Sequence, residues 1–266
     1  MRCIGFASTS EYVSTSPVRL PNITDCVFRR YLTKGKLTSP YRRYHATHLS
    51  NDSWKKVAVV RDPLERLISC FSSKCHQNGS FVRAFGRATC YNCSDDFGCF
   101  VRRNYNYWLG RSRTGKGSQI GSAMLYDHLM PQYWFCDFSH SLDKYSLLYY
   151  KGSEQFRHNV RFMFSQVLKF PRNLVYSGWG DKGEQPFMSV SASLSNATYK
   201  RTGMTLLSTD LQLLDIAFRT YFIDYAMLNF TIPSFAISLC ENESRFKSNR
   251  YFICRYLASL QIMNSY

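Results

Sequence analysis

The strongest constraint on the fold is a strand signal followed at once by a helix signal, within residues 57–71. Val57-Ala-Val-Val60 is an unbroken apolar run rich in β-branched residues, which is typical of a strand buried on both faces of a parallel sheet. Asp62 then stands where a helix N-cap belongs and Pro63 at the first helical position, with Glu65 as the reciprocal cap. The chain is therefore expected to contain a buried strand that leads directly into a helix.

The predicted helix is amphipathic. Its apolar residues follow the spacing i, i+3, i+4, i+7, which places them on one side of a helix. They are Leu64, Leu67, Ile68 and Phe71. This stripe is expected to pack on the sheet.

Further along the chain, strands and helices continue to alternate. Residues 145–150 read as a second buried strand, residues 156–168 have helical spacing, and a last helix is expected from about Thr209, with a capping box formed by Thr209 and Gln212. This alternation indicates an α/β fold with a central parallel sheet.

Three segments are expected to lie outside this regular pattern. Residues 1–53 are polar and rich in turn-forming residues, so an irregular lead-in is predicted there. Residues 76–122 contain many Gly, Arg and Tyr and a cluster of cysteines, which is typical of a long crosslinked excursion. The domain itself is expected over 54–233, followed by an atypical C-terminal extension over 234–266.

Charge and hydropathy narrow the possible partners. The chain has 266 residues with 34 Lys and Arg against 18 Asp and Glu, a net charge of +16, which attracts nucleic acid, anionic lipid or acidic glycan. No segment reaches the roughly 18 uninterrupted apolar residues of a membrane span, and no signal peptide is visible at the N-terminus.

Sequons and cysteines favour the lumen of the secretory pathway over the cytosol. Seven Asn-x-Ser/Thr sequons occur, where about two are expected by chance. They begin at Asn22, Asn51, Asn78, Asn92, Asn196, Asn229 and Asn242. The ten cysteines are also more than a reducing compartment usually calls for. We therefore expect a lumenal protein whose own secretion signal lies outside the given chain.

Arg61 and Ser69 are the first candidate site residues. Arg61 ends the predicted strand, where open α/β sheets bind ligands, and its guanidinium can hold a phosphate with two hydrogen bonds. Ser69 lies about two turns into the helix, on a different face from the apolar stripe, where its hydroxyl could join the same phosphate. The alternative is structural, with Arg61 paired to a carboxylate and Ser69 merely exposed.

A second phosphate-binding candidate fits less well. Residues 110–117 approach the G-x-x-x-x-G-K-[S/T] pattern, but Gly117 stands where the metal-binding hydroxyl belongs. No buried strand precedes the segment and no apolar helix follows it, so a basic loop is the favoured interpretation.

The segment from Lys56 to Phe71 matches every fixed position of the pattern R-D-P-x-x-R-x-x-S-x-F. It resembles the 3′-phosphate-binding segment of Golgi carbohydrate sulfotransferases of the chondroitin 4-sulfotransferase type. The likeness continues through the cysteine cluster, the segments 128–138 and 145–150, and a late aromatic helix ending in 229–233. It covers about two-thirds of the chain.

This resemblance implies a fold, a reaction and site residues. The fold would be the P-loop-NTPase-like sulfotransferase fold, and the donor 3′-phosphoadenosine 5′-phosphosulfate (PAPS), with Arg61 and Ser69 on its 3′-phosphate and no metal. The sulfuryl group would pass to a sugar hydroxyl of an acidic, glycosaminoglycan-type glycan in the Golgi. His128 matches the family histidine ahead of Pro131 and Trp134 and is the favoured general base, with a purely structural histidine as the alternative.

The resemblance also gives the clustered cysteines a role. In the family this cluster is disulfide-bonded loop scaffolding, which carries over to Cys75, Cys90, Cys93 and Cys99 with the pairing unassigned. Zinc is the rival interpretation for Cys90-x-x-Cys93, although no second pair at finger spacing follows.

One departure from the family bears on activity. Family members bind the 5′-phosphosulfate on an earlier strand-loop-helix and carry an N-terminal membrane anchor, and neither is visible in residues 1–56. The alternative to an active enzyme is therefore an inactive lumenal glycan-binding paralogue or a truncated gene product of the same family. A nucleic-acid binder is a third hypothesis, which the sequons and cysteines disfavour, so nucleic acid is not an expected partner.

Overall fold

The structure, a computed structural model, is described here in two units that its internal packing separates. One unit contains Met1–Arg61 and Gln132–Ser191, and the other contains Asp62–Pro131 and Ala192–Tyr266. The residues described are 2–7, 54–76, 79–93, 95–114, 125, 128–135, 138–150, 159, 162, 194–244 and 250–263. The helix predicted over 156–168 lies outside them, apart from residues 159 and 162.

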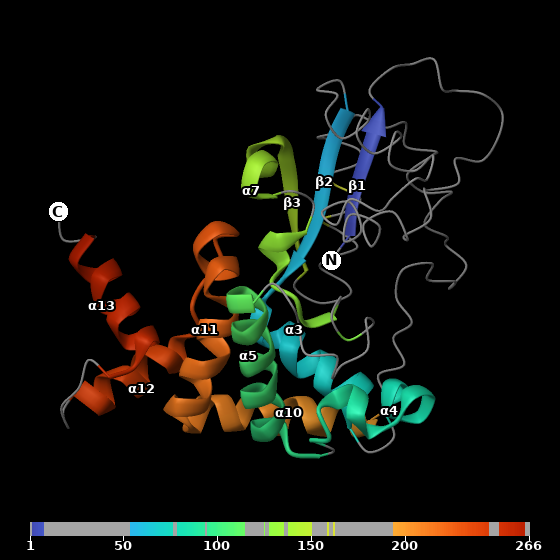
Figure 1. The fold of residues 1–266 in the computed structure, drawn as a ribbon. Helices are drawn as coiled ribbons and strands as arrows, with labels where there is room; N and C mark the ends of the chain where they lie inside the picture. Colours follow the sequence, from blue (N-terminus) through green and yellow to red (C-terminus); the bar gives the residue numbers. More distant parts are fainter. Residues whose placement is uncertain are drawn as a thin grey trace. The chain divides into compact units, whose positions relative to one another are not determined.

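The first unit contains a sheet of the order β1-β2-β3 (Figure 1). Its strands are β1 (Arg2–Ala7), β2 (Trp54–Arg61) and β3 (Tyr145–Tyr150). β2 runs parallel to β3, with Arg61 opposite Tyr150, and antiparallel to β1. Both predicted strands and their parallel pairing are confirmed.

The strand β1 was not expected in the irregular lead-in, and it makes the sheet mixed rather than wholly parallel. Its sequence, Arg-Cys-Ile-Gly-Phe-Ala, has a glycine at its centre and no turn signals at its ends that would separate it from its polar surroundings. Pairing with β2 outweighs this weak local preference, as tertiary context often does for strands.

The second unit is helical. Its longer elements are α3 (Pro63–Cys70), α5 (Phe97–Thr114), α10 (Leu194–Thr209), α11 (Leu211–Met227), α12 (Ser234–Ser244) and α13 (Phe252–Met263). Shorter ones are a π-helical turn at Phe71–Cys75, α4 (Ser80–Phe85) and a 3-10 turn at Arg87–Cys90. In the first unit, short helical segments at Gln132–Trp134, Phe138–Ser141 (α7) and Leu142–Lys144 precede β3.

Helix α3 begins as predicted. Asp62 is the N-cap and accepts a hydrogen bond from the backbone N–H of Glu65 at 2.9 Å, with Pro63 at the first position. The whole predicted apolar stripe is buried. At Ile68 the packing is tight, because a Cβ on Gly203 of α10 would lie 3.1 Å from its Cγ2. Glycine thus allows α10 to approach α3 closely.

The crosslinked excursion predicted over 76–122 is largely helical in its described part, which corrects that expectation. Within it, α5 contacts α11 and buries Phe100, Asn104 and Trp108. The side-chain oxygen of Asn104 accepts a hydrogen bond from the Trp108 indole, and its amide donates to the Tyr221 hydroxyl. These partners satisfy a polar group that would otherwise be costly to bury. Of the phosphate-binding candidate at 110–117, residues 115–117 lie outside the described residues.

The last predicted helix exists, but its capping box was assigned one residue too early. The N-cap of α11 is Asp210, whose carboxylate accepts from the backbone N–H of Leu213 at 2.9 Å. Thr209 instead ends α10, and its hydroxyl donates to the carbonyl of Thr205. Aspartate is a stronger cap than threonine, which explains the shift.

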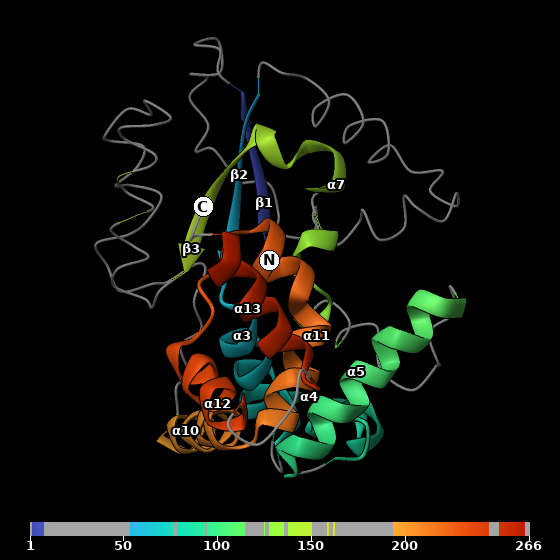
Figure 2. The same cartoon turned by 90° about the vertical axis from the view of Figure 1, so that its left-hand side faces the viewer.

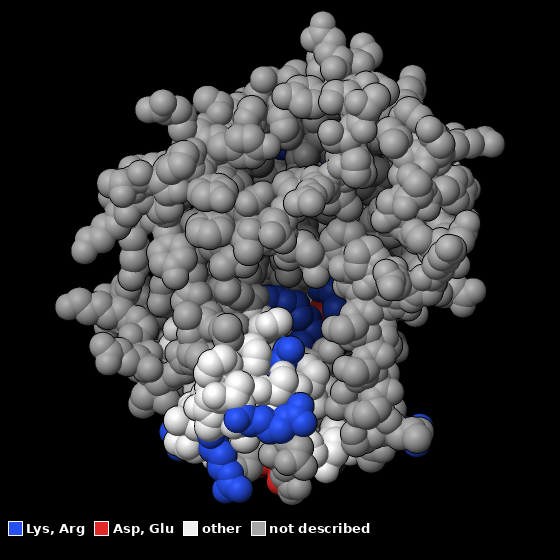
Figure 3. Space-filling model, turned by 90° about the vertical axis from the view of Figure 1, so that its right-hand side faces the viewer, with Lys and Arg blue, Asp and Glu red and all other residues white. Residues whose placement is uncertain are grey.

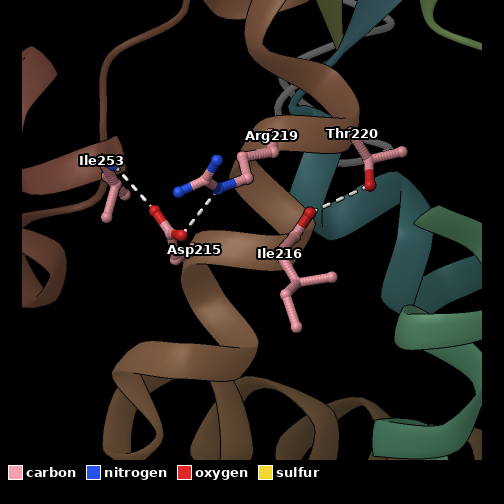
Figure 4. A network of polar contacts seen from close by, with 5 residues as sticks. All are labelled: Asp215, Ile216, Arg219, Thr220 and Ile253. Carbon is pink, nitrogen blue, oxygen red and sulfur yellow. Dashed lines mark hydrogen bonds and ion pairs between the residues drawn. The ribbon is translucent and has the colours of Figure 1, made fainter. Parts of the chain in front are cut away.

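Beyond α11, the C-terminal helices α12 and α13 contact α11 and each other (Figure 2). A disulfide joins Cys240 of α12 to Cys254 of α13. Asp215 of α11 holds the start of α13 by accepting a hydrogen bond from the backbone of Ile253 (Figure 4). The extension is therefore fixed to α11.

The clustered cysteines form two disulfides, Cys75–Cys90 and Cys93–Cys99. The expectation of crosslinked scaffolding is confirmed, and the rival zinc interpretation is wrong because these sulfurs are bonded to one another. Throughout the described ranges, no helix is both long and apolar enough to cross a membrane.

Candidate functional site

Arg61 ends β2, and one buried side chain fixes its backbone. The side-chain oxygen of Gln132 accepts a hydrogen bond from the Arg61 N–H at 2.9 Å, and the Gln132 amide donates to the Arg61 carbonyl at 2.7 Å. Gln132 is 1% exposed. The position of Arg61 is thus tied to a residue 71 positions further along the chain.

The side chain of Arg61 lies against an aromatic ring. Its Cζ is 5.2 Å from the ring centroid of Tyr150, the residue opposite it in the parallel β2–β3 ladder. This distance is within the range of a cation–π contact. Because both residues end their strands, the contact lies at the carboxyl edge of the sheet, where α/β proteins bind ligands.

Asp62, the second fixed position of the pattern, has a structural role in the helical unit. Besides capping α3, its carboxylate accepts a hydrogen bond from the Tyr225 hydroxyl of α11 at 3.4 Å. Burial raises the pKa of Asp62, helped by the charge of Glu65 and opposed by the backbone hydrogen bonds of the cap. The pKa of Tyr225 is also raised, first by burial and then by Asp62.

Ser69 lies in α3 and is half-buried. Its carbonyl accepts hydrogen bonds from the hydroxyls of Ser72 and Ser73, at 3.2 and 2.7 Å. Arg61 and Ser69 fall in different units, so their joint binding of one phosphate stays a prediction.

Arg66, also a fixed position of the pattern, ties α3 to the segment that carries His128. Its Nη1 donates to the carbonyl of Met130 at 2.7 Å. The sequence singled out Arg66 as part of the pattern but gave it no role. The available signal was that Arg66 is a fixed position of this pattern.

His128 lies beside a phenylalanine and two cations. Its ring is 5.5 Å from that of Phe81, edge to face, and the Lys74 Nζ is 5.1 Å from the same Phe81 ring. Although His128 is exposed, surrounding protein atoms still desolvate its ring. This desolvation and the charges of Lys74 and Arg66 lower the pKa of His128 to about 4.

The chemical consequence is a neutral imidazole at physiological pH with two cations nearby. A neutral imidazole can accept a proton, although a pKa of about 4 makes this ring a weaker base than a free imidazole, and the neighbouring cations can stabilise developing negative charge. The sequence did not point to Lys74. It lies in the π-helical turn Phe71–Cys75, and only the fold brings that turn to Phe81 of α4.

Metal chemistry has no visible ligand set in the ranges described. No group of three or more His, Cys, Asp or Glu side chains gathers there in a way that could hold an ion. His76 forms a pair with Asp95, with 3.3 Å between Nε2 and Oδ1, and stacks on Tyr199.

Comparison with known proteins now identifies the family. Residues 14–231, most of the chain, match the model of the sulfotransferase family. Carbohydrate sulfotransferase chst-1 of Caenorhabditis elegans is 30% identical over 120 residues, which is 45% of this chain and 35% of that protein. The chain thus matches about a third of the relative's length. No solved structure matches. The chain belongs to the sulfotransferase family.

Proposed function

We propose that the protein transfers a sulfuryl group from PAPS to a sugar hydroxyl of an acidic, glycosaminoglycan-type glycan. The observation that carries this proposal is Arg61, held at the carboxyl edge of the sheet by Gln132 and Tyr150 within the pattern R-D-P-x-x-R-x-x-S-x-F. A cation in this place, fixed by buried contacts, suits a phosphate. The family match and the carbohydrate sulfotransferase relative support the reaction class.

In this proposal each predicted site residue has one task. Arg61 and Ser69 bind the 3′-phosphate of the donor. His128, neutral near pH 7, takes the proton from the acceptor hydroxyl as its oxygen bonds to sulfur. The donor supplies the sulfuryl group, and the bond between sulfur and the 5′-phosphate oxygen breaks, so that 3′-phosphoadenosine 5′-phosphate leaves.

The electrostatics of the described surface agree with an anionic acceptor. The chain has a net charge of +16, and Figure 3 shows Lys and Arg as the main charged side chains on the described part of one face. Positive surfaces of this kind raise the local concentration of polyanions. An acidic glycan is the partner that also fits the carbohydrate sulfotransferase relative.

We propose the Golgi lumen as the place of action and the P-loop-NTPase-like sulfotransferase fold as the architecture. Three disulfides among the described residues support an oxidising compartment. A buried strand that leads into a capped helix and pairs in parallel with β3 supports the fold. We place the end of the domain at residue 233, before an extension over 234–266, since the family match ends at residue 231 and α12 begins at Ser234. The family match begins at residue 14 and β1 pairs with β2, so this support does not extend to a domain start at residue 54.

Calorimetric titration with 3′-phosphoadenosine 5′-phosphate tests the donor site. We expect binding by the unsubstituted chain and a loss of at least tenfold in affinity in Arg61→Ala, since a hydrogen bond to a charged group contributes about 1.5–3 kcal/mol. Arg103→Ala, an exposed arginine of α5, is the matched control. Absence of binding, or equal binding by Arg61→Ala, would contradict the donor assignment.

A labelled-sulfate transfer assay on desulfated chondroitin tests the reaction. Transfer from labelled PAPS that is lost in Arg61→Ala supports the enzyme. Retention of the glycan without any transfer would instead support the inactive, glycan-binding alternative.

A further inference from the structure

We infer that Gln132 and Tyr150 are positioning residues that orient Arg61 for the donor 3′-phosphate and thereby determine selectivity for that phosphate. This inference rests on the proposed function and adds to it. Neither residue carries a charge, and nothing in the sequence pattern at 61–71 points to either.

The first step concerns the Arg61 backbone. One amide side chain accepts from the Arg61 N–H and donates to its carbonyl, at 2.9 and 2.7 Å. An amide side chain does both at once through its oxygen and its nitrogen, whereas a carboxylate only accepts and an apolar side chain does neither. Gln132 is buried, so these bonds are shielded from competing water.

The second step concerns the guanidinium. Register places Tyr150 directly opposite Arg61, and the Tyr150 ring lies 5.2 Å from Cζ. An aromatic face attracts a guanidinium and limits its rotamers, while the N–H groups point outward in the plane of the guanidinium and stay able to donate. Gln132 thus fixes the backbone of Arg61, and Tyr150 restricts the position of its guanidinium.

The consequence is specific to one phosphate. Two parallel hydrogen bonds from a guanidinium to a phosphate require a set orientation, and a side chain that is already oriented loses less entropy on binding. Replacing either positioning residue should lower the affinity for ligands that carry a 3′-phosphate. The affinity for ligands without this phosphate should not change.

The experiment compares two ligands in the full chain. Affinities for 3′-phosphoadenosine 5′-phosphate and for adenosine 5′-monophosphate, which lacks the 3′-phosphate, are measured by calorimetry in the unsubstituted chain, Tyr150→Leu, Tyr150→Phe and Gln132→Glu. We expect Tyr150→Leu to bind the first ligand about 2- to 30-fold more weakly, the range to which cation–π energies convert. Its affinity for the second ligand should be unchanged. Tyr150→Phe keeps the ring and should restore binding.

Gln132→Glu gives an independent reading, because it retains an acceptor but loses the donor to the Arg61 carbonyl. We expect it, too, to lower the affinity for 3′-phosphoadenosine 5′-phosphate alone. Thermal unfolding identifies any variant that fails to fold. If Gln132→Glu does not fold, the comparison of Tyr150→Leu with Tyr150→Phe tests the inference. In an Arg61→Ala background, Tyr150→Leu should have no further effect.

The outcomes separate this inference from the proposed function. If the unsubstituted chain binds and Arg61→Ala does not, but Tyr150→Leu binds as well as Tyr150→Phe, the positioning role is overturned while the donor site stands. Equal weakening of both ligands would also overturn it, since that indicates general damage. If the unsubstituted chain binds neither ligand, the proposed function and this inference both fail.

Discussion

Asp215 of α11 holds the backbone N–H of Ile253 in α13 at 2.8 Å, across 38 residues of chain. Its second oxygen accepts from the Nε of Arg219 at 2.7 Å, and the carboxylate is buried (Figure 4). Asp215→Ala leaves the Ile253 N–H without this acceptor, so we expect the free energy of unfolding to fall by about 1–3 kcal/mol. Urea denaturation measures the loss. Arg255→Ala, exposed on α13, should change it by less than about 0.5 kcal/mol.

Removing the disulfide between Cys75 and Cys90 should destabilise the helical unit. The bridge closes a loop with a sequence separation of 15, for which chain entropy predicts about 3 kcal/mol. The double variant Cys75→Ser with Cys90→Ser is compared with the oxidised parent by denaturation under non-reducing conditions. Peptide mapping should recover the pairs Cys75–Cys90 and Cys93–Cys99, and any exchange of partners would contradict the assignment.

His128 should make the stability of the protein depend on pH. Its pKa is about 4 when folded, against an ordinary value of 6.5, so the unfolded chain takes up a proton first as pH falls. The neutral ring therefore contributes stability above pH 6.5, and this contribution is lost as pH falls from 6.5 to 4. Denaturation midpoints across this window should fall less steeply in His128→Gln than in the parent.

His140→Gln, another exposed histidine, is the matched control and should follow the parent profile. If transfer is observed, its rate should show no acidic limb from His128 above about pH 5, because the base is already neutral there. A limb near pH 6.5 that disappears in His128→Gln would show that the ring is not held neutral.

Asn229 should be glycosylated when the chain is made through a secretory pathway. Asn229 and Thr231 of this sequon are both exposed, and the asparagine has a positive φ of 53° in the turn after α11. Digestion with an amidase that removes N-glycans, followed by peptide mass analysis, should find Asn229 converted to aspartate. Asn229→Gln should remove one glycan. An unmodified Asn229 in a chain glycosylated at other sequons would refute the prediction.

The sequence predicted those features that local patterns encode. The unbroken run at 57–60 and the cap at Asp62 each fit one structure, and both were confirmed. α5 was missed because its Gly and Tyr residues are weak helix formers, and its burial depends on α11, more than 100 residues away. β1 was missed for the same reason, since only pairing with β2 reveals it.

The residues of the candidate site likewise fall into those that the sequence pattern marks and those that only the fold brings together. Arg61 could be found because a strand end and a fixed pattern mark it. Gln132 and Tyr150 could not, because their contacts with Arg61 depend on a side chain 71 residues distant and on the register of two strands. Lys74 likewise meets His128 only through Phe81.

The spacing of the crosslinks has a consequence for biosynthesis. Cys75–Cys90 and Cys93–Cys99 join cysteines 15 and 6 positions apart, whereas Asn104 meets Tyr221 across 117 residues. A ribosome that has delivered residue 99 beyond its tunnel has released every sulfur these two bridges need, while α11 is still unmade. An oxidising compartment can therefore form both disulfides beside α4 early in translation, whereas α5 can be buried against α11 only after α11 has been made.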